Sequence, residues 1–230
     1  MDDIMALSAT FGVVISVLGY FLGIWLKKKT GLALMNPLLI SIALVIIILL
    51  ATNIDYDTYN QSAKYLSYLL TPATVALAIP LYLQLERLKK NFVAIIVSLT
   101  AGALTSMGVI LIMSVLFHFT HEEYVTMLPK SITTAIGMGV SEELGGIVTI
   151  TVAVIIITGI LGNILAEFVL KIFKISDPVA KGLSLGAASH AIGTAKAMEM
   201  GEIEGAMSSL AIVVSGLLTV VGASIFAELY

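Results

Sequence analysis

The sequence predicts an all-α polytopic membrane protein. Hydrophobic residues make up 59% of its 230 residues and charged residues 12%, whereas soluble domains average about 45–50% apolar and about 25% charged residues. The mean hydropathy is +1.06. A soluble fold of this length cannot bury so much apolar surface, so lipid must cover part of it. We therefore expect one integral membrane domain over residues 1–230.

The apolar residues fall into stretches that are long enough to cross a bilayer. A helix of about 20 residues spans the roughly 30 Å of hydrocarbon, and backbone groups in lipid must bond within their own segment, which favours helices. The predicted spans are residues 4–26, 32–51, 65–85, 92–117, 147–170 and 206–229.

The basic residues predict the orientation of these spans. Nine of the twelve lie in three clusters, within residues 27–29, 87–90 and 171–181. The loops between these clusters are acidic or polar, which is the positive-inside pattern. It places the three clusters in the cytoplasm and the N-terminus outside.

Two further stretches are too polar and too rich in glycine to face lipid. Residues 125–146 must enter and leave on the outer side, because the spans on both sides of this stretch have their outer ends there. Residues 182–205 have the same character and would dip from the cytoplasm. Such re-entrant or broken segments occur where protein buries them or where they line a wet cavity. In the alternative topology, residues 182–200 cross completely and the C-terminus lies inside.

The two dips also resemble each other in sequence. The tripeptide AIG at residues 135–137 recurs at residues 191–193, and Gly145 falls on Gly201 at the same offset of 56 residues. One crossing separates the copies, so they form an inverted repeat, as in transporters that bind substrate near the midplane. A chance match between membrane-biased compositions is the alternative.

Hydroxyl and cationic side chains at mid-membrane depth predict a binding site. A charge near the bilayer centre costs about 2.5–3.5 kcal/mol, so it faces a cavity or a partner, and half-helix N-termini add positive potential. Such donors favour a small anion, most simply a carboxylate. The predicted substrate-binding residues are Asn36, Thr71, Thr74, Ser131, Thr133, Thr134, Ser189, His190, Thr194 and Lys196.

Several of these residues have a structural alternative. Lys196 can snorkel to the cytoplasmic surface, and His190 can be neutral and bonded to a backbone carbonyl. Asn36 can cap a helix, and the hydroxyls can bond back to helix carbonyls. Prolines in the third span would kink it and expose Thr71 and Thr74, or would serve packing alone.

Two carboxylates, Glu142 and Glu143, are candidates for a coupling proton or sodium ion, or else line an exposed mouth. Other chemistry is excluded or disfavoured. The absence of cysteine excludes thiolate nucleophiles and cysteine-ligated metals, and the three histidines lack metal-ligand spacing. No nucleophile–base pair indicates an enzyme, and no cofactor or metal is expected. The net charge of −3 does not indicate a nucleic-acid-binding surface.

Four strings in the chain are long and specific: NPLL at residues 36–39, LTPATVALAIP at 70–80, LPKSITTAIGMGVSEELGG at 128–146 and GAASHAIGTAKA at 186–197. On these strings the chain resembles the LrgB/CidB family of bacterial inner-membrane proteins over nearly its whole length. The resemblance implies a multi-pass protein of the bacterial cytoplasmic membrane.

The resemblance implies two kinds of function. The family is named for an antiholin-like role, in which it restrains murein hydrolases and autolysis together with a small holin-like partner, LrgA. Related proteins are implicated in movement of pyruvate, and a similar plastid protein carries glycolate and glycerate. With the carboxylate site, this favours a transporter of small monocarboxylates such as pyruvate, working with an LrgA-type partner and forming a homodimer. The alternative is a regulator of autolysis with no substrate of its own.

Overall fold

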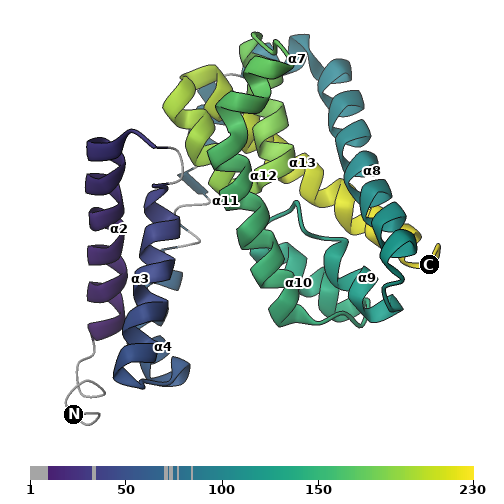
Figure 1. Cartoon of the computed structure of the whole chain (residues 1–230). Coiled ribbons are helices and arrows are strands. Elements are labelled where there is room, and N and C mark those ends of the chain that lie inside the picture. The colour runs from purple at the N-terminus through teal and green to yellow at the C-terminus, as the bar shows by residue number, and fades with distance from the viewer. Residues whose placement is uncertain (1–9, 33–34, 70–71, 73–74, 77, 84) are drawn as a thin grey trace. The chain divides into compact units, whose positions relative to one another are not determined.

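The computed structural model describes residues 10–32, 35–69, 72, 75–76, 78–83 and 85–230, and its elements are α-helices (Figure 1). Among these residues, four helices are long and apolar enough to cross a membrane. They are α2 (Phe11–Thr30), α8 (Phe92–Phe117), α11 (Val148–Ile172) and α13 (Glu202–Ala227). Together with the shorter apolar helix α3 (Pro37–Thr52), they support the predicted membrane class.

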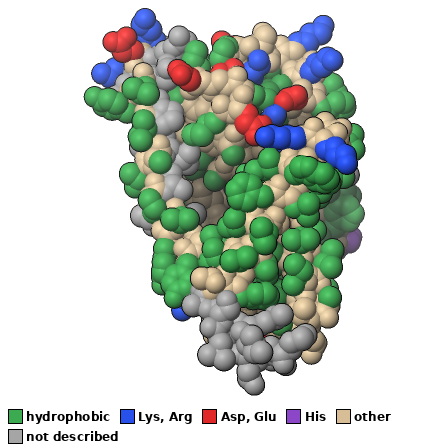
Figure 2. All heavy atoms as spheres, turned by 90° about the vertical axis from the view of Figure 1, so that its left-hand side faces the viewer, with side chains coloured by type: hydrophobic (Ala, Val, Ile, Leu, Met, Phe, Trp, Pro, Cys, Tyr) green, Lys and Arg blue, Asp and Glu red, His purple; other side chains and the backbone are tan. Residues whose placement is uncertain are grey.

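The surface exposes many large apolar side chains, as expected of a protein in contact with lipid. Hydrophobic side chains are numerous on the face drawn in Figure 2. Large side chains on the long helices remain exposed, for example Phe21 at 61% and Leu116 at 65%. In water, continuous apolar surface of this kind would drive association, so a hydrocarbon environment accounts for it.

The chain divides into two compact units, Met1–Ala76 and Leu77–Tyr230. In the first unit, α2 packs against α3 and α4 (Tyr56–Ser67). Glycine lets the backbones approach closely, because a Cβ on Gly23 would lie only 2.6 Å from Cα of Pro37. Ser41 Oγ also donates to the backbone carbonyl of Ser16 at 2.8 Å.

In the second unit, α13 packs against α8, against α6 (Ala78–Leu83) and most extensively against α12 (Pro178–Met200). α12 in turn packs on α11. Glycines again allow the contact, since a Cβ on Gly186 would lie 2.7 Å from Cβ of Ala211. α7 (Leu85–Lys90), α9 (His121–Met127) and α10 (Thr134–Glu143) complete the helices described in this unit.

The segment predicted as the cytoplasmic dip is a broken helix. α12 consists of two helical halves that meet at His190, whose φ of 42° and ψ of −134° are not helical. The other predicted dip, residues 125–146, contains the end of α9, irregular backbone over residues 128–133, α10 and a turn. Both segments therefore interrupt regular helix, as the sequence predicts.

Two predicted spans differ from the helices observed. Within residues 65–85, α4 ends at Ser67 and a turn follows at residues 68–69. α6 and the first residue of α7 come later in this stretch, beyond positions that lie outside the described residues, and Pro80 lies inside α6. The second span begins at Pro37 rather than at residue 32, because Asn36 and Pro37 form a strong helix start.

Candidate functional site

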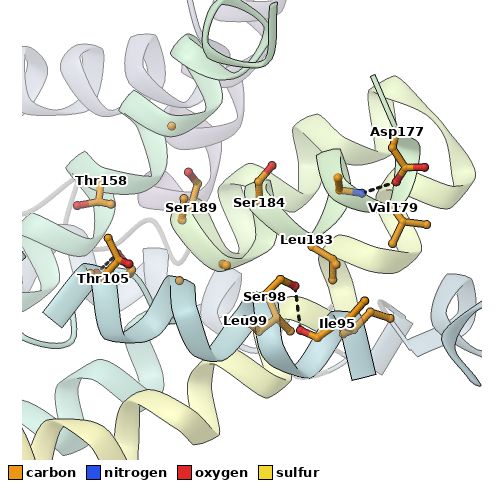
Figure 3. Close-up of a pocket in the computed structure, with 18 of the residues that line it drawn as sticks. Ile95, Ser98, Leu99, Thr105, Thr158, Asp177, Val179, Leu183, Ser184 and Ser189 are labelled. Atoms are coloured by element: carbon orange, nitrogen blue, oxygen red, sulfur yellow. Dashed lines mark hydrogen bonds between the residues drawn. The ribbon is translucent and has the colours of Figure 1, made fainter. Parts of the chain in front are cut away.

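A cavity of about 1080 Å³ lies within the second unit. It is bounded by α8, by the irregular stretch before α10, by α11 and by the first half of α12 (Figure 3). The lining side chains are small, hydroxyl-bearing or aliphatic, with one lysine and one aspartate. Two of the helices that are long and apolar enough to span a membrane, α8 and α11, therefore line the cavity.

Hydroxyl groups enter the cavity from three helices. In Figure 3, Ser98 and Thr105 come from α8, and Thr158, Ser184 and Ser189 come from α11 and α12 on the other side. Ser98 Oγ is engaged within its own helix, where it donates to the carbonyl of Ile95 at 2.9 Å. Thr105 Oγ1 and Ser184 Oγ likewise donate within their own helices, to the carbonyls of Ala101 at 2.7 Å and of Lys181 at 2.9 Å. Ser106, Thr158 and Ser189 are the other helix hydroxyls on the lining.

Lys130 is the one basic residue among the described lining residues. Its Nζ donates to Ser131 Oγ at 2.9 Å, and Ser131 Oγ lies 3.1 Å from Ser106 Oγ on α8. The residue is half-buried, and no carboxylate in the described part of the chain lies within ion-pair distance of it. An ammonium group carries three donors, so Lys130 keeps donor capacity for a ligand.

The carboxylate on the lining belongs to Asp177, which has a structural task. Its Oδ1 accepts from the backbone N–H of Ala180 at 2.9 Å and so caps α12. Asp177 is exposed, and the bond satisfies one of the free donors at the helix start. It does not neutralise Lys130.

Of the residues predicted to bind substrate, Ser131 and Ser189 line this cavity. Thr133 begins α10 as its N-cap residue without a side-chain cap bond, and Thr134 is the first residue of that helix. Thr194 is buried in the second half of α12, four residues after the break at His190, and its Oγ1 donates to the carbonyl of His190 at 2.9 Å.

The two cations selected from sequence lie elsewhere. His190 is 3% exposed, and its Nε2 lies 3.0 Å from the backbone carbonyl oxygen of Ile155 on α11. Lys196 Nζ lies 2.6 Å from a carboxylate oxygen of Glu167, whose side chain is 71% exposed, and 3.4 Å from Glu199. The bond of His190 to a backbone carbonyl is the structural alternative raised from the sequence, whereas Lys196 is paired with carboxylates.

Three of the remaining predicted residues are not among the described lining residues. Asn36 belongs to the first unit and caps α3, accepting from the N–H of Leu38 at 2.9 Å. Glu142 and Glu143 are exposed in the last turn of α10. Thr71 and Thr74 lie outside the described residues.

Sequence reasoning missed Lys130 and the hydroxyls of α8, although both carry a signal. Lys130 lies inside the predicted dip over residues 125–146, so the argument that selected Lys196 applies to it equally. On α8, Ser98, Gly102, Thr105 and Ser106 recur at helical spacing and mark one small, polar face.

Comparisons with known proteins identify relatives of the whole chain. A profile of the LrgB-like family matches residues 16–229. The antiholin-like protein LrgB of Bacillus subtilis (strain 168) is 38% identical over 224 residues, which cover 97% of each chain. The proteins of the same name from Bacillus mycoides (strain KBAB4) and Bacillus cereus (strain B4264) are each 40% identical over 212 residues, 92% of each chain. None of these three relatives bears the name of an enzyme, and no solved structure matches significantly.

Proposed function

We propose that this chain, which belongs to the LrgB-like family, carries small monocarboxylates such as pyruvate across the bacterial cytoplasmic membrane. The observation that carries the proposal is Lys130, a cation without a carboxylate partner among the described residues, in a hydroxyl-lined cavity between helices of membrane-spanning length. Carboxylates are bound most strongly by charge-assisted hydrogen bonds of this kind.

The roles follow from the contacts. The Lys130 ammonium neutralises the carboxylate, and the Ser131 hydroxyl, already 2.9 Å from Nζ, orients it. Ser106 and Ser189 supply further hydroxyls from facing helices. A few placed polar groups on an apolar wall are typical of sites for small organic ligands.

His190 and Thr194 support this site as positioning residues. His190 bonds to α11 at the break in α12, directly after Ser189, and Thr194 bonds to the His190 carbonyl. Thr194 Oγ1 also lies 2.7 Å from Ser208 Oγ on α13. These buried bonds hold the break, and with it Ser189, against both neighbouring helices.

For transport we propose six spans, with the N-terminus outside and two oppositely oriented broken segments as an inverted repeat. The helix bounds support the repeat. Shifted by 56 residues, α10 falls on residues 190–199, against 191–200 for the second half of α12, and α11 falls on residues 204–228, against Glu202–Ala227 for α13. Glu142 and Glu143 are the candidates for a coupling proton or sodium ion.

The proposal includes a homodimer and a small LrgA-type membrane partner. The second candidate function is regulation of murein hydrolases and autolysis without a substrate, which the name of the relatives supports, since all three are called antiholin-like. The two functions differ in what crosses the membrane: one small anion at a saturable site, or nothing that this chain itself binds.

The test uses purified protein in liposomes, with and without the LrgA-type partner. Labelled pyruvate counterflow and release of a trapped bulky dye are followed in the same vesicles. We expect saturable counterflow with the dye retained. Dye release without saturable counterflow, or no flux of either kind, would contradict the carrier and favour the regulatory function.

A further inference from the structure

A second cavity, of about 650 Å³, lies where α11 ends and α12 begins. Three lysines from this turn line it, Lys171, Lys174 and Lys181. It shares no lining residue with the hydroxyl-lined cavity, and the carboxylate proposal does not use it. We call it the lysine pocket.

The positive charge of the lysine pocket is not cancelled by its own carboxylates. Within the described part of the chain, no Asp or Glu oxygen lies within 4.0 Å of the three lysine ammonium groups. Of the two acidic residues on the lining, Glu167 is paired with Lys196 at 2.6 Å. Glu204 is 9% exposed and packs against Gly201 at the start of α13. The pocket is therefore suited to an anion.

The backbone of the lysine pocket is strained at one of its three lysines. Just after the end of α11 at Ile172, Lys174 has a φ of 54°, and the N–H of Ile175 donates to the carbonyl of Leu170 at 2.9 Å. Glycine is the usual residue at such a left-handed helix end, because a side chain is strained there. Strain retained at a binding site is a known sign of function, and here it places an ammonium group in the pocket.

The position of the pocket points to the source of the anion. α11 is one of the helices long and apolar enough to span a membrane, so its last turn lies at the level of lipid headgroups. Basic pockets between helices at the cytoplasmic surface bind lipid phosphates. We propose that the lysine pocket binds the phosphate of an anionic phospholipid headgroup such as phosphatidylglycerol.

The test compares lipid retention by the purified full-length protein. Mixed micelles contain phosphatidylglycerol or phosphatidylcholine, and bound lipid is counted by native mass spectrometry. Each lysine removed should weaken retention of phosphatidylglycerol about fivefold, so Lys171→Gln with Lys181→Gln lowers it about 25-fold. The matched control, Lys89→Gln with Lys90→Gln, removes two exposed charges of α7 that do not line the pocket, so retention should fall clearly less than in the pocket variant.

Lys174→Gly separates binding from folding. Glycine relieves the strained φ, so the variant should unfold at a higher temperature than the wild type and yet retain less phosphatidylglycerol. Equal loss in the α7 control, equal retention of phosphatidylcholine, or full retention by the pocket variants would overturn the proposal. Displacement of bound lipid by millimolar inorganic phosphate is compatible with it, whereas binding of phosphate without any binding of phosphatidylglycerol would refute the lipid assignment.

Discussion

Lys130 and Lys196 lie in the two segments that interrupt the membrane helices, yet their surroundings are opposite. Lys130 lines the cavity and donates to Ser131, without a carboxylate partner among the described residues. Lys196 is held by Glu167 and Glu199, and the Glu167 side chain is 71% exposed. A lysine inside a membrane costs free energy unless it faces a cavity or a partner. Lys130 lines a cavity, and Lys196 has carboxylate partners.

The polar, glycine-rich character of a segment identifies candidate lysines. Whether a lysine already has a carboxylate partner decides which candidate can bind the substrate. Both segments are polar and rich in glycine, and both carry a lysine near a run of hydroxyls. An ammonium group already engaged by two carboxylates gains little from a substrate carboxylate, whereas one that contacts only a hydroxyl gains a full charge-assisted bond.

Lys130→Gln has the largest expected effect. Truncating one partner of a buried charged pair costs about 2–5 kcal/mol, so pyruvate counterflow at low substrate falls by at least about 30-fold. The measurement is initial counterflow in liposomes containing equal amounts of folded protein. Lys130→Arg keeps the charge and should retain more activity than the glutamine variant; equal activity in both variants and the wild type would break the comparison.

Ser131→Ala should have an intermediate effect. It removes a hydrogen bond to the ligand that contributes about 1 kcal/mol, so the concentration for half-maximal counterflow rises about fivefold. Ser98→Ala is the control from the same cavity, because the Ser98 hydroxyl is already bonded to the Ile95 carbonyl. An equally large rise of the half-maximal concentration in Ser98→Ala would contradict a specific role of Ser131. It would mean that removing any hydroxyl from the cavity weakens binding.

Lys196→Gln should have the smallest effect on transport. The pair with Glu167 is largely exposed on the carboxylate side, and such pairs contribute about 0.2–1 kcal/mol. Counterflow should therefore stay within about threefold of the wild type. A loss of counterflow comparable to that of Lys130→Gln would indicate that Lys196 belongs to the substrate site.

Much of the fold follows from the sequence because lipid imposes simple rules. The predicted spans over residues 92–117, 147–170 and 206–229 correspond closely to α8, α11 and α13. The break at His190 falls inside the predicted dip over residues 182–205. The third span differs at its start, because α4 ends at Ser67, within the predicted residues 65–85.

The candidate site was less predictable, for a physical reason. Sequence indicates the depth of a side chain but not its direction. Of the predicted residues, Ser131 and Ser189 line the cavity, whereas the hydroxyls of α8 that also line it lie in an apolar run and were not predicted. Glu167 lies 29 residues before Lys196 on another helix. Their pairing depends on how α11 packs against α12, which no local pattern encodes.

The most direct test is equilibrium binding of labelled pyruvate to the purified protein, by scintillation proximity, for the wild type, Lys130→Gln and Lys196→Gln. We expect saturable binding that is lost in Lys130→Gln and kept in Lys196→Gln. Binding that survives in Lys130→Gln and disappears in Lys196→Gln would contradict a carboxylate site in the hydroxyl-lined cavity.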